Sequence, residues 1–265
     1  MPFVQLPSFA LHYHQWGAGR PFLFLHGLGD SGLQAFELLG EAPGTSLVAP
    51  DFRGHGRTNY DGPPTGYRIP VFAEDVLALL DRLGLEKVPV IGLSLGAAVA
   101  LNLAIRWPER VQEMLLLRPA WLNQPYPYNL DLFLLAGRLI AEKGVDAARV
   151  AFKESEEYGV FLEKHPEAAD TMLALFRREY PGGAHDALTR LPGTVPFMDY
   201  AELRSVNMPV KVVTTQNDPF HPWNYGRLLA EGLPNSQLDQ LPPRYRRPEE
   251  YFRELRGLGE RFRHP

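Results

Sequence analysis

Two polar residues of this sequence have the types and the settings expected of a nucleophile and an acid. Ser94 stands between Gly92 and Gly96, after the apolar run 88–91 and before the alternating apolar segment 97–107. This order predicts a strand, a sharp turn and a helix, with the serine hydroxyl presented at the end of the strand. Asp218 follows a second apolar run, at 210–214. Together the two residues could support acyl transfer through a serine, provided that a base activates the hydroxyl.

The base is the missing part of this pattern. His221 comes three residues after Asp218, and three residues span at most about 10 Å, so its imidazole is close to the acid. His185 and His264 are two further candidates, and the absence of any histidine base is a fourth possibility. Residue types alone leave the choice open.

The elements that must position these residues alternate along the chain. The segment 69–83 has apolar residues at spacings of three and four, which is typical of an amphipathic helix. Alternating strands and helices predict a mostly parallel, twisted sheet flanked by helices. An antiparallel hairpin is expected at 4–6 and 11–16. The predicted strands are short apolar runs closed by turn residues, at 22–25, 47–49, 88–91, 111–117, 210–214 and 237–241.

One long segment interrupts this alternation. It begins after residue 122 with several prolines and tyrosines, contains helical patterns and shows no apolar run typical of a buried strand. We interpret 123–200 as a helical cap inserted between a first core segment, 1–122, and a last one, 201–265. Its apolar residues predict packing over the strand ends, where open parallel sheets bind ligands. The candidates to line a pocket there are aromatic: Trp121, Tyr126, Tyr128, Phe133 and Phe176.

Four landmarks, taken in order, resemble the α/β-hydrolase fold family. They are the segments 26–30 (HGLGD), 51–56 (DFRGHG), 92–96 (GLSLG) and 218–222 (DPFHP). The resemblance covers almost the whole chain. It implies that Ser94 lies on a nucleophile elbow, that Asp218 is the acid, and that the backbone N–H groups of Leu28 and Leu95 form an oxyanion hole.

The chain departs from the family at one position. In the family the base is a histidine on the loop after the last strand, whereas segment 242–248 (PPRYRRP) contains none. Neither Arg nor Tyr replaces it readily, because Arg stays protonated and Tyr has an ordinary pKa near 10. Loss of such a base from a working triad lowers turnover by about a millionfold.

The composition and motifs of the chain limit the classes of partner, metal and cofactor to be expected. The formal net charge of −4 gives no reason to expect nucleic acid or an anionic membrane as partner. The sequence has no cysteine, so disulfides and thiolate metal sites are excluded. No helical pair of histidines or carboxylates, phosphate loop or dinucleotide motif is present, so we expect neither a metal nor a cofactor. Residues 1–7 lack a basic region followed by an apolar stretch, and no run of eighteen apolar residues occurs, which favours the cytoplasm.

Three hypotheses for function remain open at this level, of which one is a different reaction on the same scaffold, such as that of a lyase or an acyltransferase, and the other two are favoured. The first is a hydrolase of a small, hydrophobic ester, lactone or amide that uses Ser94, Asp218 and an atypical base such as His221. The second is a catalytically inactive relative that binds a small molecule in the same pocket. Arg118, at the end of the apolar run 111–117, either forms a structural salt bridge or binds an anionic substrate. The sequence does not indicate an oligomeric state.

Overall fold

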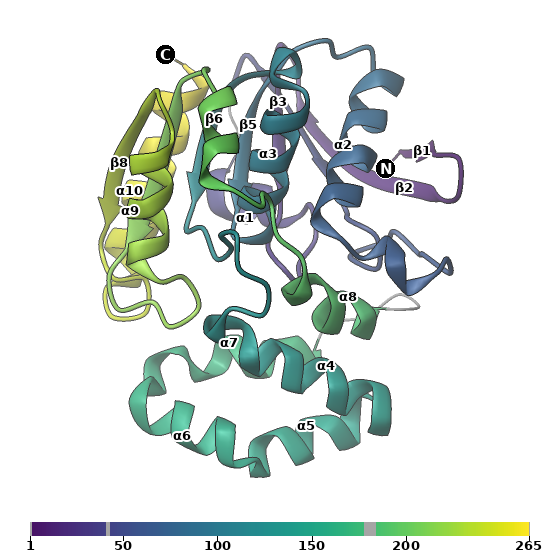
Figure 1. Cartoon of the computed structure of the whole chain (residues 1–265), viewed down its shortest axis with the longest axis vertical. Helices are drawn as coiled ribbons and strands as arrows, with labels where there is room; N and C mark the ends of the chain where they lie inside the picture. Colours follow the sequence, from purple (N-terminus) through teal and green to yellow (C-terminus); the bar gives the residue numbers. More distant parts are fainter. Residues whose placement is uncertain (1, 41–42, 178–183, 265) are drawn as a thin grey trace.

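An eight-stranded sheet forms the centre of the computed structural model, which describes residues 2–40, 43–177 and 184–264. The strand order is β1-β2-β4-β3-β5-β6-β7-β8, in which β1 and β2 are antiparallel to their neighbours and all other pairs are parallel (Figure 1). The strands are β1 Phe3–Gln5, β2 Ala10–Gly17, β3 Arg20–Leu25, β4 Thr45–Pro50, β5 Val88–Leu93, β6 Val111–Leu117, β7 Val210–Thr215 and β8 Ser236–Leu241.

Helices cover both faces of the sheet because successive strand residues alternate between two cores. In β3, Leu23 and Leu25 belong to one core cluster, while Phe22 and Phe24 belong to the other. Helices α2 (Ile69–Arg82), α3 (Leu95–Arg106) and α9 (Trp223–Gly232) pack on the first face. Helices α1 (Gln34–Leu39) and α10 (Pro248–Arg263) pack on the second.

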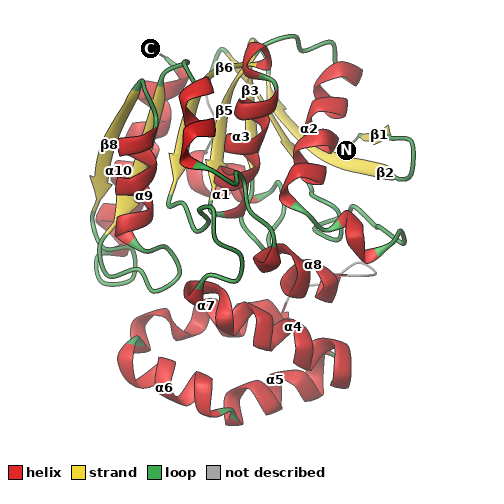
Figure 2. Cartoon of the chain, in the orientation of Figure 1, coloured by secondary structure: helices red, strands yellow, loops and turns green. Residues whose placement is uncertain are grey.

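A group of helices between β6 and β7 lies at one end of the sheet (Figures 1 and 2). It contains α4 (Asp131–Lys143), α5 (Val145–Glu154), α6 (Glu156–Lys164), α7 (Ala169–Ala174) and α8 (Ala184–Arg190). Buried residues of this group, including Phe133 and Phe152, belong to the same apolar cluster as the first face of the sheet. These inserted helices therefore share a core with the sheet. Short 3₁₀ segments occur at Pro64–Gly66, Pro108–Arg110, Tyr128–Leu130, Pro166–Ala168, Leu175–Arg177, Leu191–Gly193 and Tyr200–Ser205.

The predicted fold class is confirmed, and each apolar run that the sequence analysis interpreted as a strand lies within a strand of this sheet. Among the described residues of the expected insertion, 123–200, the regular elements are helical. The described helices include none that is both long enough and apolar enough to cross a membrane.

Candidate active site

Ser94 lies on a strained turn between β5 and α3. Its backbone has a positive φ, with φ 55° and ψ −109°, a conformation that residues other than glycine rarely adopt. The flanking glycines are sterically required: a Cβ on Gly92 would come within 2.4 Å of the Gly96 carbonyl oxygen, and one on Gly96 within 1.9 Å of the Leu25 carbonyl oxygen. The close approach of these backbones holds the serine hydroxyl at the carboxyl end of the sheet.

An imidazole reaches this hydroxyl from the turn after β7. His221 Nε2 lies 3.0 Å from Ser94 Oγ, and His221 Nδ1 lies 3.0 Å from Asp218 Oδ2. The second contact has the distance of an ion pair but does not meet the geometry of a hydrogen bond. Asp218 Oδ1 accepts a hydrogen bond from the Phe220 N–H at 3.1 Å, which fixes the carboxylate within its own turn. The acid and the imidazole thus come from four consecutive residues.

Arg118 is the second partner of Asp218. It follows β6 in a left-handed conformation, with φ 45°, and its NH1 donates to Asp218 Oδ2 at 3.0 Å. The side chains of this ion pair are 2% and 0% exposed. The structure therefore contains the salt bridge that the sequence analysis had considered as one of two roles for Arg118, and the same guanidinium also lines the cavity beside Ser94.

The charges around His221 shape its protonation. Burial of Asp218 acts to raise the pKa of its carboxyl, but His221 and Arg118 hold that pKa well below its usual range. For His221, burial lowers the pKa; Asp218 opposes this effect, and the positive charges of Arg118 and Arg244 add to it. His221 is therefore neutral at pH 7, the state in which an imidazole can accept a proton.

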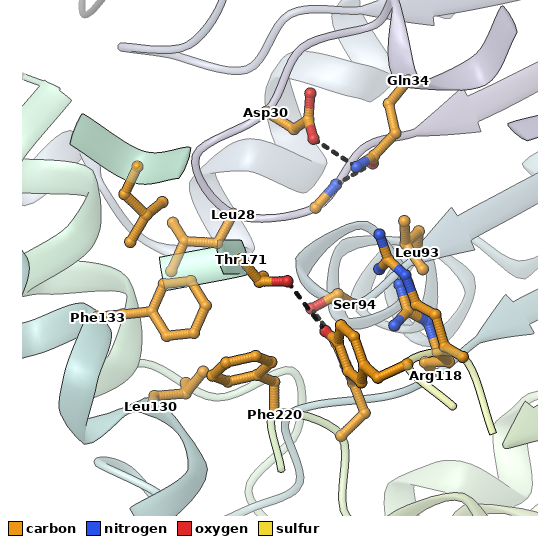
Figure 3. Close-up of a pocket in the computed structure, with 15 residues that line it drawn as sticks. Leu28, Asp30, Gln34, Leu93, Ser94, Arg118, Leu130, Phe133, Thr171 and Phe220 are labelled. Atoms are coloured by element: carbon orange, nitrogen blue, oxygen red, sulfur yellow. Dashed lines mark hydrogen bonds between the residues drawn. The ribbon is translucent and has the colours of Figure 1, made fainter. Parts of the chain in front are cut away.

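A small cavity opens beside Ser94 (Figure 3). Its volume is about 90 Å³, which is below the usual range for sites that bind drug-sized ligands. One wall is apolar and comes from Leu130 and Phe133 at the start of the cap and Phe220 of the β7 turn. The loop after β8 contributes Arg244 and Tyr245, and the Thr171 hydroxyl of α7 donates to the Tyr245 hydroxyl at 3.4 Å.

Of the two residues that the resemblance suggested for an oxyanion hole, one follows Ser94 in sequence and the other lines the same cavity. Leu95 begins α3 directly after Ser94, and Leu28 lines the cavity. Gln34 Oε1 accepts the N–H of Gly27 at 2.9 Å, which fixes the loop that carries Leu28. Among the described residues, hydrogen bonds outside the regular helices and strands do not engage the N–H of Leu28 or of Leu95.

Other predicted site residues lie elsewhere. Trp121 is 1% exposed and belongs to the apolar core, so its ring packs against neighbours and is not among the residues that line the cavity beside Ser94. Tyr126 and Tyr128 are exposed, and Phe176 is buried without lining this cavity. Of the five aromatic candidates, Phe133 lines it. The other candidate bases, His185 in α8 and His264 after α10, do not line it either.

A separate histidine and carboxylate cluster joins β2 to the turn after β4. The potential ligand atoms of His12, His14 and Asp51 all lie within 4.8 Å of one another, so these residues could hold a metal ion by distance alone. However, Asp51 Oδ1 also accepts the N–H of Gly32 at 2.7 Å, and Oδ2 accepts the N–H of Arg57 at 2.8 Å. Because backbone donors already engage both oxygens, the arrangement fits a structural hydrogen-bond cluster better than a metal centre. The expectation of no metal site rested on helical spacings, and it missed the histidine pair at positions i and i+2, which a strand places on one face.

Comparison with known proteins agrees with this architecture. The family model described as "alpha/beta hydrolase fold" matches residues 20–245. The chain belongs to the alpha/beta hydrolase fold family. Within this family, it is 32% identical over 197 residues to the protein named "Putative carbamate hydrolase RutD" of Agrobacterium fabrum, covering 72% of each chain. It is 30% identical to the protein of the same name from Rhizobium rhizogenes, covering 86% of this chain and 87% of the other.

A solved structure of the same fold is similar along nearly the whole chain. It is described as "Est816 as an N-Acyl homoserine lactone degrading enzyme", and it matches with a TM-score of 0.68 and 26% identity. The match covers 97% of this alpha/beta hydrolase chain and 99% of the other. The family membership therefore applies to the sheet and to the inserted helices.

Proposed function

We propose that this alpha/beta hydrolase cleaves a small ester, lactone or amide through Ser94, with His221 as the general base and Asp218 as the acid that orients it. The observation that carries the proposal is the 3.0 Å contact between Ser94 Oγ and His221 Nε2. A nucleophile and a base within hydrogen-bond reach, with a third group behind the base, are the geometric signature of an activated serine. His221 would take the role that the family gives to a histidine after the last strand.

The reaction follows from these atoms. As Ser94 Oγ attacks the substrate carbonyl carbon, its proton passes to His221 Nε2, and the carbonyl oxygen becomes an oxyanion that the N–H groups of Leu28 and Leu95 would stabilise. Collapse of the tetrahedral intermediate breaks the bond to the leaving group, which receives the proton from His221. Water then attacks the acyl-serine, again giving its proton to His221, and the acid product leaves as Ser94 regains its proton.

Asp218 and Arg118 would together set the proton affinity of His221, the proposed base. Asp218 Oδ2 faces both His221 Nδ1 and Arg118 NH1 at 3.0 Å, so the carboxylate supports the imidazolium that forms during reaction while a fixed cation shares its charge. We expect the Nδ1 contact to become a well-aligned hydrogen bond when substrate binds, as catalytic hydrogen bonds often do. Because the pKa of His221 lies below its ordinary value, the base is in its active form at neutral pH.

The size of the cavity and the names of the relatives support a small carbonyl substrate. A cavity of about 90 Å³ with one apolar wall holds only a small molecule unless the inserted helices move. The matched relatives are named as a carbamate hydrolase and a lactone-degrading enzyme, and both names describe attack on an acyl carbon bonded to oxygen or nitrogen. Their substrates differ, so the names support the bond type and leave the substrate open.

Covalent labelling tests the proposal directly. The purified protein is incubated with a fluorophosphonate, which traps an activated serine, and the intact mass is recorded for the wild type, Ser94→Ala and His221→Ala. We expect one adduct on the wild type, no adduct on Ser94→Ala, and labelling of His221→Ala that is slower by about a thousandfold or more. His264→Ala, which changes an exposed histidine after α10, is the matched control and should label like the wild type.

The contrary outcomes are equally specific. An unlabelled wild type at high reagent and long times would contradict a serine hydrolase and favour a small-molecule binding protein on the same fold. Wild-type labelling rates in His221→Ala would leave Ser94 as nucleophile but remove His221 as its base.

A further inference from the structure

Arg244 lines the cavity beside Ser94 and lacks an ion-pair partner among the residues that the structure describes. Arg244 lies on the loop after β8 and lines the cavity together with Ser94 and His221. Its contacts are aromatic: its Cζ lies 5.4 Å from the ring centre of Tyr245 and 5.9 Å from that of Phe252. Stacking on rings leaves the N–H groups at the edge of a guanidinium unused. Among the described residues, no carboxylate forms an ion pair with Arg244, although neighbouring Arg246 and Arg247 each have one.

Arg118 adds a second cation to the lining of the cavity. It is 3% exposed, donates one hydrogen bond through NH1, and its Nε has no partner in the described part of the chain. Its one carboxylate, Asp218, is shared with His221. Burial lowers the pKa of Arg244 and the charge of Arg118 lowers it further, whereas Asp218 acts in the opposite direction.

The carboxylate that lines the cavity, Asp30, forms hydrogen bonds with its own loop. Asp30 accepts hydrogen bonds from Gln34 Nε2 at 2.6 Å and from the Ser31 N–H at 3.0 Å. In Figure 3, Asp30 and Gln34 lie together, apart from Arg118. Arg118 shares Asp218 with His221, and Arg244 forms no ion pair among the described residues, so the positive charge of the two guanidiniums exceeds the negative charge beside them and favours an additional anion.

We propose that Arg244, supported by Arg118, forms an anion subsite that binds a carboxylate of the substrate while its carbonyl carbon lies at Ser94. The inference rests on the proposed function and narrows the substrate class to small esters, lactones or amides that carry a carboxylate. The apolar wall of Leu130, Phe133 and Phe220 would contact the short carbon chain between the two groups. The loop that has lost the family's histidine would thus select the substrate.

Binding to an inactive protein tests the subsite without catalysis. The probes are monomethyl succinate and methyl levulinate, which share a methyl ester and differ in that a carboxylate oxygen of the first is a methyl group in the second. Their affinities for Ser94→Ala are measured by titration calorimetry. Because hydrogen bonds to charged groups contribute more than neutral ones, we expect monomethyl succinate to bind at least about tenfold more tightly.

Substitutions on one loop identify the residue responsible. In the Ser94→Ala background, Arg244→Met should reduce the preference to about onefold, and Arg244→Lys should retain part of it, because the charge remains while the planar donor pair is lost. Arg246→Met is the matched control, since Arg246 is a neighbouring arginine whose side chain is 60% exposed and paired with Glu167. Arg246→Met should retain the preference for monomethyl succinate over methyl levulinate. Thermal unfolding of each variant verifies that it is folded, and Arg244→Gln replaces Arg244→Met if the latter is not.

The binding and labelling experiments test the anion subsite and the proposed hydrolysis independently. Equal affinity of Ser94→Ala for the two probes overturns the subsite, as does a preference that persists in Arg244→Met. If fluorophosphonate labels Ser94 but the probes bind equally, the proposed function stands and the subsite fails. If labelling fails but the preference is present and depends on Arg244, the subsite stands on a protein that binds rather than hydrolyses.

Discussion

Asp218 contacts both Arg118 and His221, so replacing it by asparagine should change the stability of the fold and the activity of the site together. Its Oδ2 lies 3.0 Å from Arg118 NH1 and 3.0 Å from His221 Nδ1, and its side chain is 0% exposed. Asp218→Asn keeps the shape but removes the charge, so the Arg118 guanidinium is left buried without compensation. Breaking a buried ion pair in this way destabilises proteins by about 3–5 kcal/mol. Turnover should also fall by about 10⁴, because an amide supports neither the required tautomer nor the imidazolium.

Urea unfolding at pH 7 measures the first effect and ester hydrolysis the second. Asp239→Asn is the matched control: Asp239 pairs with Lys211 at 3.0 Å on the surface, and loss of such a pair changes stability by less than about 1 kcal/mol. A double variant then tests the cause. Adding Arg118→Met to Asp218→Asn removes the unpaired charge, so most of the lost stability should return while activity does not. An Asp218→Asn variant as stable as the control, or a double variant no more stable than the single one, would refute the argument.

Three further predictions concern stability and pH. Gly96→Ala should destabilise the protein by about 3 kcal/mol in thermal unfolding, because its Cβ would lie 1.9 Å from a backbone oxygen of β3. The control is Gly159→Ala, whose Cβ meets no atom within 4 Å; it should stabilise the protein by about 0.5–1 kcal/mol. Arg244→Met should move the acid limb of kcat/KM for a neutral ester to higher pH, since loss of a nearby positive charge raises the pKa of His221; an unmoved limb would contradict the charge argument. Asp51 has a pKa below its usual range, because hydrogen bonds from a histidine and two backbone N–H groups outweigh the opposing effect of burial. Its contribution to stability is therefore complete above about pH 4 and is lost as the pH falls further, and Asp51→Asn should lower stability at pH 7 and make acid unfolding less steep.

The strands were predictable because a parallel sheet buried on both faces requires continuous apolar runs, and such runs stand out against turn residues. The run 88–91 followed by Gly92 and Gly96 also predicted a sharp turn, and the backbone of Ser94 has the left-handed φ that such a turn requires. The fold could be read from the sequence because local pattern and tertiary burial favour the same elements.

The geometry of the site was harder to predict from the sequence, because it depends on the directions of side chains. Sequence spacing allowed His221 to lie near Asp218 but did not fix the direction of its ring, which follows from the turn that the Phe220 N–H closes on Asp218 Oδ1. The orientation of Arg118 depends on a left-handed residue after β6, which no local pattern predicted. Trp121 was expected in a pocket, but large aromatic residues pack in cores at least as readily. Arg244 was considered only as a failed base, although its place after the carboxyl end of β8 could have suggested a ligand contact.

The position of the acid and the imidazole on one turn has an evolutionary consequence. In a site assembled from two loops, each loop is constrained by the other, because a shift of either one changes the alignment of base and acid. Here residues 218–221 determine that alignment within a single turn, and the proposed base imposes no demand on the loop after β8. Segment 242–248 can therefore accept substitutions, insertions or changes of charge that alter which molecules enter, while the nucleophile and base keep their geometry. Such a division allows new substrate preferences to arise by mutation of one short loop.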